Sequence, residues 1–347
     1  GLGCQLLAIF ALLSLLCPSQ AIASDLRRSA IVRAVEKASP AVVNIHGRKT
    51  VRNRSIGRNA QPAERHVNGM GTGILFDERG YILTNFHVVQ GVESIMVTQH
   101  DKTTNVATLV SHDQATDLAI IKIAAKTALP TIRTGNSDTL MPGETVIAVG
   151  NAYGYQHTVT RGIVSALNRN VQVNETQRYA NLIQTDASIN PGNSGGPLLN
   201  IDGEMIGVNV AVRIGAQGIG FAIPTNDALA IAARLLASSR NDHTIGLVGT
   251  THYAGESSRY IVKNVMADSV AEKKGIRAGD VILEIAGVAV HNDLDFERGM
   301  LAANPNGPIA VRLARNSEHL SFALASRPAQ KEHTSELWST LGLKLTS

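Results

Sequence analysis

The stretch "QTDASINPGNSGGPLLN", from Gln184 to Asn200, decides the fold, because one serine lies in it among several glycines and prolines. Its central residues, Gly192 to Gly196, fit two patterns. One is the G-x-S-x-G nucleophile elbow, which lies between a strand and a helix in α/β-hydrolases. The other is G-x-S-G-G-P, which places the serine on a loop between strands. A third possibility is a tight turn in which the serine has no chemical role.

The segment after the serine separates the first two patterns. Pro197 follows the second glycine, and the next residues, "LLNIDGEMIGVNV", form two apolar runs around Asp202-Gly203. Short apolar runs on either side of an Asp-Gly pair predict a β-hairpin. Because a nucleophile elbow needs a helix at this point, the sequence favours the pattern in which Ser194 lies between strands.

A histidine and an aspartate upstream complete a catalytic pattern. His87 ends the apolar stretch "LTNFHVV", and Asp117 opens the apolar run "DLAIIKI". The order His87, Asp117, Ser194 is that of the chymotrypsin-like triad. A serine hydroxyl needs an adjacent base to become a nucleophile. His87 is therefore the expected base, and Asp117 the residue that fixes the histidine tautomer. Each residue alone would have a structural explanation, and the joint pattern favours catalysis.

The glycines around Ser194 suit an oxyanion hole, which we predict from Gly192, Asn193 and Ser194. A turn at Gly192 would aim its N–H and that of Ser194 at one point, where such donors stabilise a developing oxyanion. Gly195 and Gly196 would leave room for the substrate backbone.

Composition limits the class of protein. The chain has 347 residues, 44% of them hydrophobic and 17% charged, which is enough for two or three globular domains. Short apolar runs punctuated by Gly and Asn predict a mainly β protein. The net charge of +4 is too mild to indicate nucleic-acid binding. No HExxH or paired-cysteine spacing occurs, so we expect no metal and no cofactor.

The first 23 residues differ from the rest. An apolar core from Leu6 to Leu16 precedes Ala21-Ile22-Ala23, which is an A-x-A cleavage pattern. We predict a signal peptide over residues 1–23, with an uncleaved membrane anchor as the alternative. Both cysteines, Cys4 and Cys17, lie in this segment, so the exported protein would contain no disulfide.

Several boundaries can be placed along the rest of the chain. A helical segment is expected over 24–40 with its apolar spacing in Leu26 to Ala38, and a β-barrel region over 41–237. Asp77 to Gly80 predicts a hairpin turn. The stretch between Gly47 and Gly69, "RKTVRNRSIGRNAQPAERHVN", is polar and basic and predicts a long mobile loop. The barrel region is expected to end in a helix capped by Thr225 or Asn226.

These stretches together resemble the HtrA/Deg family of exported trypsin-like serine proteases. The matching stretches are "GTGILFDERGYILTNFHVV", "DLAIIKI", "GETVIAVGNAYG", "VTRGIVSALNR", "LIQTDASINPGNSGGPLLNIDGEMIGVNV" and "GIGFAIP", and they cover most of Ala41 to Pro224. The resemblance implies two six-stranded barrels with the active site between them. Asn193 stands where digestive proteases have Asp, which implies regulation by loop rearrangement. Ala152 stands where relatives often have Pro, without consequence for catalysis.

The C-terminal module, residues 244–328, resembles a PDZ domain. The stretch Thr244-Ile245-Gly246-Leu247 resembles its carboxylate-binding loop, whose N–H groups hold a peptide C-terminus. The two helices are expected at Val265 to Lys274 and Asp295 to Ala303. Residues 329–347 echo the start of the module, and we interpret them as the possible beginning of a second PDZ domain.

The resemblance implies a serine endopeptidase of the periplasm or cell envelope that degrades misfolded or unfolded proteins. Its PDZ domain would capture peptide C-termini, and the assembly would be a homotrimer or a multiple of trimers. The primary specificity pocket is expected to be small and apolar and to be lined by Ile189, Asn209, Val210 and Ala211. The rival interpretation is a chaperone or scaffold that binds through the same grooves without turnover.

Overall fold

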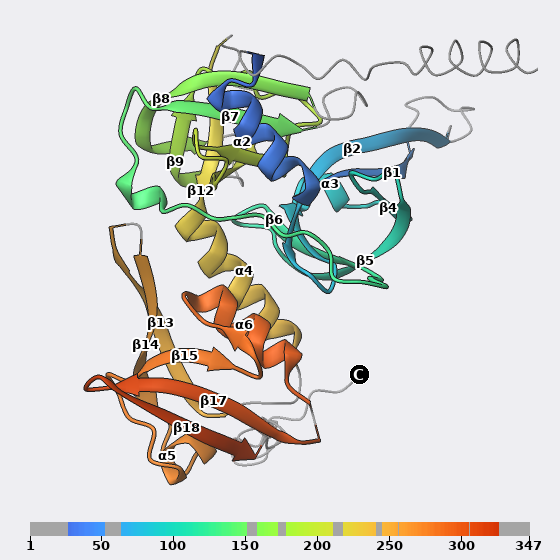
Figure 1. The fold of residues 1–347 in the computed structure, drawn as a ribbon. Coiled ribbons are helices and arrows are strands. Elements are labelled where there is room, and N and C mark those ends of the chain that lie inside the picture. Colours follow the sequence, from blue (N-terminus) through green and yellow to red (C-terminus); the bar gives the residue numbers. More distant parts are fainter. Residues whose placement is uncertain are drawn as a thin grey trace, which may run out of the picture.

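The computed structural model describes residues 27–52, 64–150, 158–172, 178–210, 218–240, 245–255, 257–304 and 306–325. Within them the chain forms two closed six-stranded barrels and a smaller C-terminal sheet (Figure 1). All strand pairs of these sheets are antiparallel. The prediction of a mainly β protein with a double barrel and a C-terminal module is confirmed.

The first barrel has the strand order β1-β2-β3-β6-β5-β4. Its strands are β1 (Val42–Arg52), β2 (Glu64–Asp77), β3 (Tyr81–Asn85), β4 (Ile95–Thr98), β5 (Thr104–Asp113) and β6 (Leu118–Ile123). The one-turn helix α3 (Phe86–Val89) follows β3. The β6 sequence "LAIIKI" is almost continuously apolar because both faces of this strand are covered, so that five of its six residues are buried.

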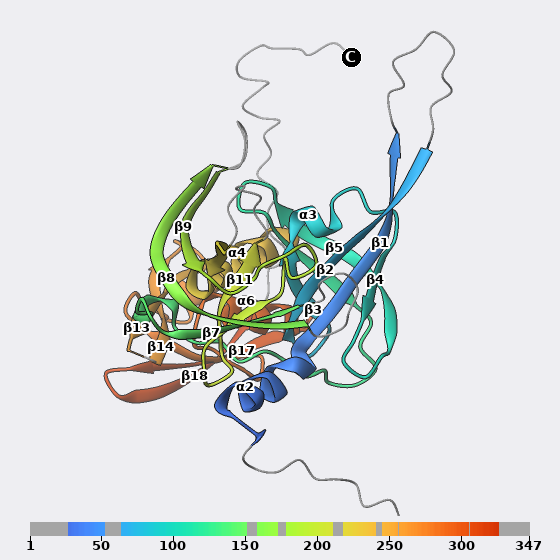
Figure 2. The same cartoon turned by 90° about the horizontal axis from the view of Figure 1, so that it is seen from above.

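The second barrel has the order β10-β11-β12-β9-β8-β7. Its strands are β7 (Thr145–Gly150), β8 (Thr158–Gln172), β9 (Arg178–Thr185), β10 (Pro197–Leu199), β11 (Met205–Val210) and β12 (Gly220–Pro224). The short helix η4 (Ser137–Thr139) precedes it. The hairpin predicted around Asp202-Gly203 joins β10 to β11. Figure 2 shows that the outer ends of β1–β2 and of β8–β9 project on the same side of the molecule.

The region predicted as a mobile loop, Gly47 to Gly69, is partly strand. Residues 47–52 of β1 pair with 64–69 of β2. The prediction was wrong for these positions because polarity was interpreted as irregular backbone. An edge ribbon can have polar side chains as long as its backbone groups are paired. The predicted turn at Asp77 to Gly80 is confirmed, since the Gly80 N–H donates to the Asp77 carbonyl at 3.0 Å.

The N-terminal helix α2 (Ala30–Ala38) begins after Ser29, whose hydroxyl accepts from the Val32 N–H. It is shorter than predicted at its start and continues into the 3₁₀ turn η3 (Ser39–Ala41). The Lys37 ammonium reaches the Asp202 carbonyl at 2.8 Å, which ties α2 to the β10–β11 turn.

Helix α4 (Thr225–Ser239) leaves the second barrel and packs between the barrels and the C-terminal sheet (Figure 1). The predicted cap was wrong, because Pro224 occupies the N-cap position. The Thr225 hydroxyl donates instead to the Met205 carbonyl at 2.8 Å, and the Asn226 amide donates to Asn136 Oδ1 at 2.7 Å. The side chains of Thr225 and Asn226 therefore bond to residues outside the helix and do not cap it.

The C-terminal module is a sheet of β13 (Leu247–Ala254), β14 (Ser257–Val265), β15 (Val281–Ile285), β17 (Pro308–Arg315) and β18 (Glu318–Ala325), with β16 (Val288–Ala289) paired to β15. Its helices are α5 (Val270–Lys273) and α6 (Asp293–Ala302). The predicted first helix was too long, because residues up to Val265 belong to β14. The second helix lies where the sequence predicted it.

Two partly exposed arginines and the buried Asp77 join the module to the first barrel. The Arg298 guanidinium on α6 donates to Asp77 at 2.8 Å, and Arg79 donates both to Asp77 and to the Arg298 carbonyl. Burial alone would raise the pKa of Asp77, but the hydrogen bonds from Arg79 and Arg298 outweigh it and lower the pKa to about 2. Nearby, Arg240 forms an ion pair with Glu297 at 2.6 Å.

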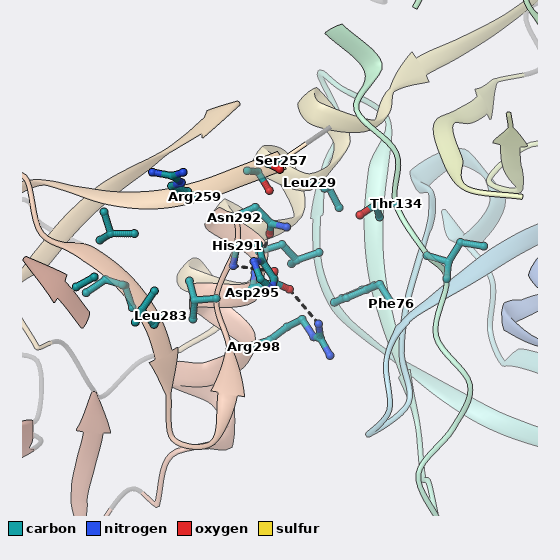
Figure 3. Close-up of a pocket in the computed structure, with 17 residues that line it drawn as sticks. Phe76, Thr134, Leu229, Ser257, Arg259, Leu283, His291, Asn292, Asp295 and Arg298 are labelled. Carbon is teal, nitrogen blue, oxygen red and sulfur yellow. Dashed lines mark hydrogen bonds and ion pairs between the residues drawn. The ribbon is translucent and has the colours of Figure 1, made fainter. Parts of the chain in front are cut away.

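A cavity of about 750 Å³ lies at this junction (Figure 3). Phe76, Thr134 and Leu229 line it from the barrel side and Leu283, Asn292 and Arg298 from the module. No helix in the described ranges is long and apolar enough to cross a membrane. The predictions for residues 1–23, for Ala152 and for residues 329–347 lie outside the described residues.

Candidate active site

His87 is positioned by the end of β3. Asn85, the last residue of β3, pairs with Leu118 of β6, so the chain leaves β3 directly beside the start of β6. The Phe86 N–H and the Asn85 side-chain amide both donate to the Asp117 carbonyl, at 2.9 and 3.1 Å. Two residues far apart in the sequence, His87 and Asp117, are therefore adjacent.

The Asp117 carboxylate holds His87 at two points. Its Oδ2 lies 2.6 Å from His87 Nδ1, and its Oδ1 accepts the His87 backbone N–H at 2.8 Å. An acidic partner on Nδ1 keeps the proton there and leaves Nε2 as the basic nitrogen. Asp117 has a φ of +57°, an uncommon value for a residue other than glycine, and is buried.

Ser194 lies on two successive tight turns. The Asn193 N–H donates to the Asn190 carbonyl at 2.9 Å, closing a turn with Pro191 and Gly192 at its centre. Gly192 has a φ of +105°, and Pro followed by a positive-φ Gly is the type II pattern. The Gly196 N–H then donates to the Asn193 carbonyl at 3.0 Å. The glycines are required by the turn, and the turn presents the serine.

Asn209 of β11, in the second barrel, is hydrogen-bonded to this loop. The Gly195 N–H donates to the Asn209 carbonyl at 2.9 Å, and the Asn209 N–H donates to the Gly196 carbonyl at 2.8 Å. The Asn209 side chain donates to the Pro197 carbonyl at 2.9 Å and is fully buried. Asn209 therefore fixes the backbone that follows Ser194.

The first barrel holds the same loop through Thr72 of β2. The Thr72 N–H donates to the Ser194 carbonyl at 2.9 Å, and the Thr72 hydroxyl donates to the Gly192 carbonyl at 2.7 Å. The Thr72 carbonyl in turn accepts the Thr84 hydroxyl at 2.7 Å. Because Thr84 lies on β3, this chain of bonds connects the strand before His87 to the serine loop.

Among the three predicted oxyanion residues, Asn193 differs in the hydrogen bond that its backbone N–H makes. The Asn193 N–H is used within the turn, and both ends of the peptide group joining Gly192 to Asn193 are held, by Thr72 and by Asn190. The oxyanion role is therefore proposed below for the N–H groups of Gly192 and Ser194 and not for that of Asn193.

The predicted pocket residues have different surroundings. Ile189 is half-buried, and a Cβ on Gly220 would come within 2.6 Å of it, so Gly220 leaves space at that side chain. Val210 is buried in the core, and Asn209 is engaged with the serine loop. Ala211 lies outside the described residues. The pocket assignment stays a prediction.

The predicted carboxylate-binding loop leads into β13. Thr244 lies outside the described residues, Ile245 is in the module core, and Leu247 is the first residue of the strand. Gly246 has a φ of +76°, and its carbonyl accepts the Met266 N–H at 2.9 Å. The binding role of this loop also stays a prediction.

Three residues near the site were not found by sequence reasoning: Thr72, Thr84 and Tyr179. The Tyr179 hydroxyl donates to Asp117 Oδ2 at 2.8 Å. Thr72 stands between two glycines in "GTG", and this pattern was the one local feature of the sequence that set Thr72 apart. Within the described ranges, no three His, Cys, Asp or Glu side chains are grouped so that they could hold a metal ion.

Comparison with known families agrees with this geometry. The family model for a trypsin-like peptidase domain matches residues 71–208, and the model for a PDZ domain matches residues 234–325. Fold and matches together define the class, a trypsin-like serine endopeptidase with a C-terminal PDZ domain.

Among known proteins, the chain is 34% identical over 335 residues to a probable periplasmic serine endoprotease DegP-like of Marinomonas sp. MWYL1, covering 85% of this chain and 71% of the relative. It is 37% identical over 329 residues to the putative serine protease HhoA of Synechocystis sp. PCC 6803, covering 85% and 84%. A solved structure of the HtrA-type protease AlgW with a decapeptide matches with a TM-score of 0.52 and 32% identity, covering 86% and 98%.

The chain belongs to the HtrA/Deg family of serine proteases. It is a serine-type endopeptidase with a PDZ domain, and peptides are its partners. The periplasmic relatives support a location in the periplasm or cell envelope.

Proposed function

We propose that His87, Asp117 and Ser194 are the catalytic triad of this endopeptidase. The contact between His87 Nδ1 and Asp117 Oδ2, at 2.6 Å, is the observation that carries the proposal. It comes together with a serine presented on a loop that both barrels hold, through Thr72 and Asn209.

In the proposed reaction His87 Nε2 takes the proton of the Ser194 hydroxyl while Oγ bonds to the scissile carbonyl carbon. The negative charge on the carbonyl oxygen is stabilised by the N–H groups of Gly192 and Ser194, each worth about 10²–10³ in rate. The protonated His87 then donates to the leaving amine as the C–N bond breaks. A water molecule deacylates Ser194 by the same steps, with His87 again as base.

We assign the peptide substrates to misfolded or unfolded proteins of the envelope. An extended chain suits a protease site formed where two barrels meet, and a PDZ groove captures chain ends by adding them as a strand. The structure of AlgW with a decapeptide supports the capture of peptides by a relative. We assign Ile245, Gly246 and Leu247, with Thr244 before them, to carboxylate binding. A homotrimer and a cleaved signal peptide over residues 1–23 complete the proposal.

The proposed specificity is for small apolar residues such as Val, Ala or Ile before the scissile bond. The half-buried Ile189 beside Gly220 supports it. Sequencing the products of casein digestion tests it directly, and products that end mainly in Lys or Arg contradict it.

The experiment for the proposed function compares the exported chain with Ser194→Ala on unfolded casein, with and without C-terminal peptides. Cleavage by the parent and loss in Ser194→Ala support a protease that uses Ser194. Cleavage that persists in the variant refutes the assigned nucleophile. Binding of casein without cleavage under all conditions supports the chaperone or scaffold interpretation instead.

A further inference from the structure

The Asp117 carboxylate has a second side-chain donor besides His87. The Tyr179 hydroxyl donates to Asp117 Oδ2 at 2.8 Å, and Tyr179 is 8% exposed. Burial first, and then the negative charge of Asp117, raise the pKa of Tyr179 above its ordinary value. The hydroxyl is therefore protonated at neutral pH, where it can donate.

Tyr179 reaches Asp117 because β9 contains a bulge. In a regular strand, residues three apart face opposite sides, yet Tyr179 and Leu182 are both buried. The pairing with β8 shifts register between them, and Asn181 has a φ of +58°. The Asn181 amide donates to Asp227 of α4 at 2.7 Å, which locks the bulge. Bulges of this kind commonly re-aim a side chain beside an active site.

The hydrogen bond from Tyr179 holds the Asp117 carboxylate independently of His87. The two other donors to the carboxylate, Nδ1 and the backbone N–H, both belong to His87. The terminal torsion of an aspartate is soft, so its donors decide how the carboxylate is turned. Without Tyr179, the carboxylate and the imidazole could turn together.

Each barrel thus contributes a residue that fixes a proposed catalytic residue of the other barrel. Thr72 of the first barrel fixes the loop with Ser194, which belongs to the second. Tyr179 of the second barrel fixes Asp117, which belongs to the first. We propose that Tyr179 is a positioning residue that sets the direction of the His87 ring relative to Ser194 by orienting Asp117. The inference rests on the proposed triad.

The test is Tyr179→Phe, which removes one oxygen and keeps the ring. Tyr81→Phe is the matched control, since the Tyr81 hydroxyl accepts from Lys122 and makes no contact with Asp117. We expect kcat on a peptide substrate to fall about 10-fold with KM unchanged, as for loss of one hydrogen bond to a charged group. Tyr81→Phe keeps kcat within about twofold. The downfield NMR signal of the His87 Nδ1 proton should broaden in Tyr179→Phe alone.

The outcomes of these measurements separate positioning from a purely structural role. Equal kcat values in the two variants with an unchanged proton signal overturn the inference. If Tyr179→Phe unfolds at lower urea concentration, kcat is compared at a temperature at which both chains are fully folded. A kcat that is still about 10-fold lower supports positioning, and a kcat equal to that of the parent overturns it. Full activity of Ser194→Ala would instead refute the triad itself, whatever Tyr179 does.

Discussion

The Thr72 hydroxyl provides a sharp test of how the serine loop is held. Thr72→Val keeps the shape of the side chain and the backbone bond to Ser194, and it removes the 2.7 Å hydrogen bond to the Gly192 carbonyl. Thr72 is fully buried, so no water replaces the lost donor readily. Leaving a buried carbonyl without its donor costs about 1–3 kcal/mol. If this whole free energy is lost from the stabilisation of the transition state, kcat/KM falls between about 5-fold and 150-fold.

The assay measures kcat and KM on a peptide substrate and the urea midpoint of each variant. Thr72→Ser is the matched control, because it keeps the hydroxyl and loses only a methyl group. We expect it to retain kcat within a few-fold, whereas Thr72→Val loses kcat with little change in KM. Equal activity of parent and Thr72→Val, at equal stability, would refute the argument that this bond fixes the turn at Gly192.

Three further predictions concern the acid and the domain junction. Asp117→Asn should lower kcat about 10⁴-fold, because an amide favours the wrong tautomer of His87, and a loss below tenfold in steady-state kinetics would contradict its role. Asp77 has its pKa lowered from 3.8 to about 2, so its contribution is present above pH 4 and is lost as pH falls through 2. Asp77→Asn should therefore abolish about 2 kcal/mol of that acid dependence in urea titrations, and an unchanged pH profile would speak against the junction network. Burial raises the pKa of Glu297 from 4.5 to about 7, against the opposing effect of Arg240. Protection of α6 amides in hydrogen exchange should then fall as pH rises from 4.5 to 7, and this fall should be absent in Glu297→Gln. Protection that rises over this range, or a fall that persists in Glu297→Gln, would contradict the prediction.

Local sequence patterns found the parts of the site that depend on the chain nearby. Ser194 was identified from its glycines, and the turn at Asn190 to Asn193 uses them as the pattern requires. His87 and Asp117 were found because each flanks an apolar run, and the pairing of β3 with β6 then brings those two ends together.

Two of the residues that were missed, Thr72 and Tyr179, act across the barrels. Tyr179 looks like one alternating position of a strand, and only the bulge at Asn181 turns it toward Asp117. Thr72 contacts a loop 120 residues away, a separation that no local pattern encodes. The cap of α4 failed for the same reason, since Thr225 and Asn226 found partners outside their own helix.

The role of Ser194 as the nucleophile can be tested by mapping a covalent adduct. The protein would be treated with a fluorophosphonate, digested, and examined by tandem mass spectrometry. We predict a phosphonyl group on Ser194, with no adduct in Asp117→Asn over the same labelling time. An adduct on another serine, or equal labelling of Ser194→Ala, would contradict it.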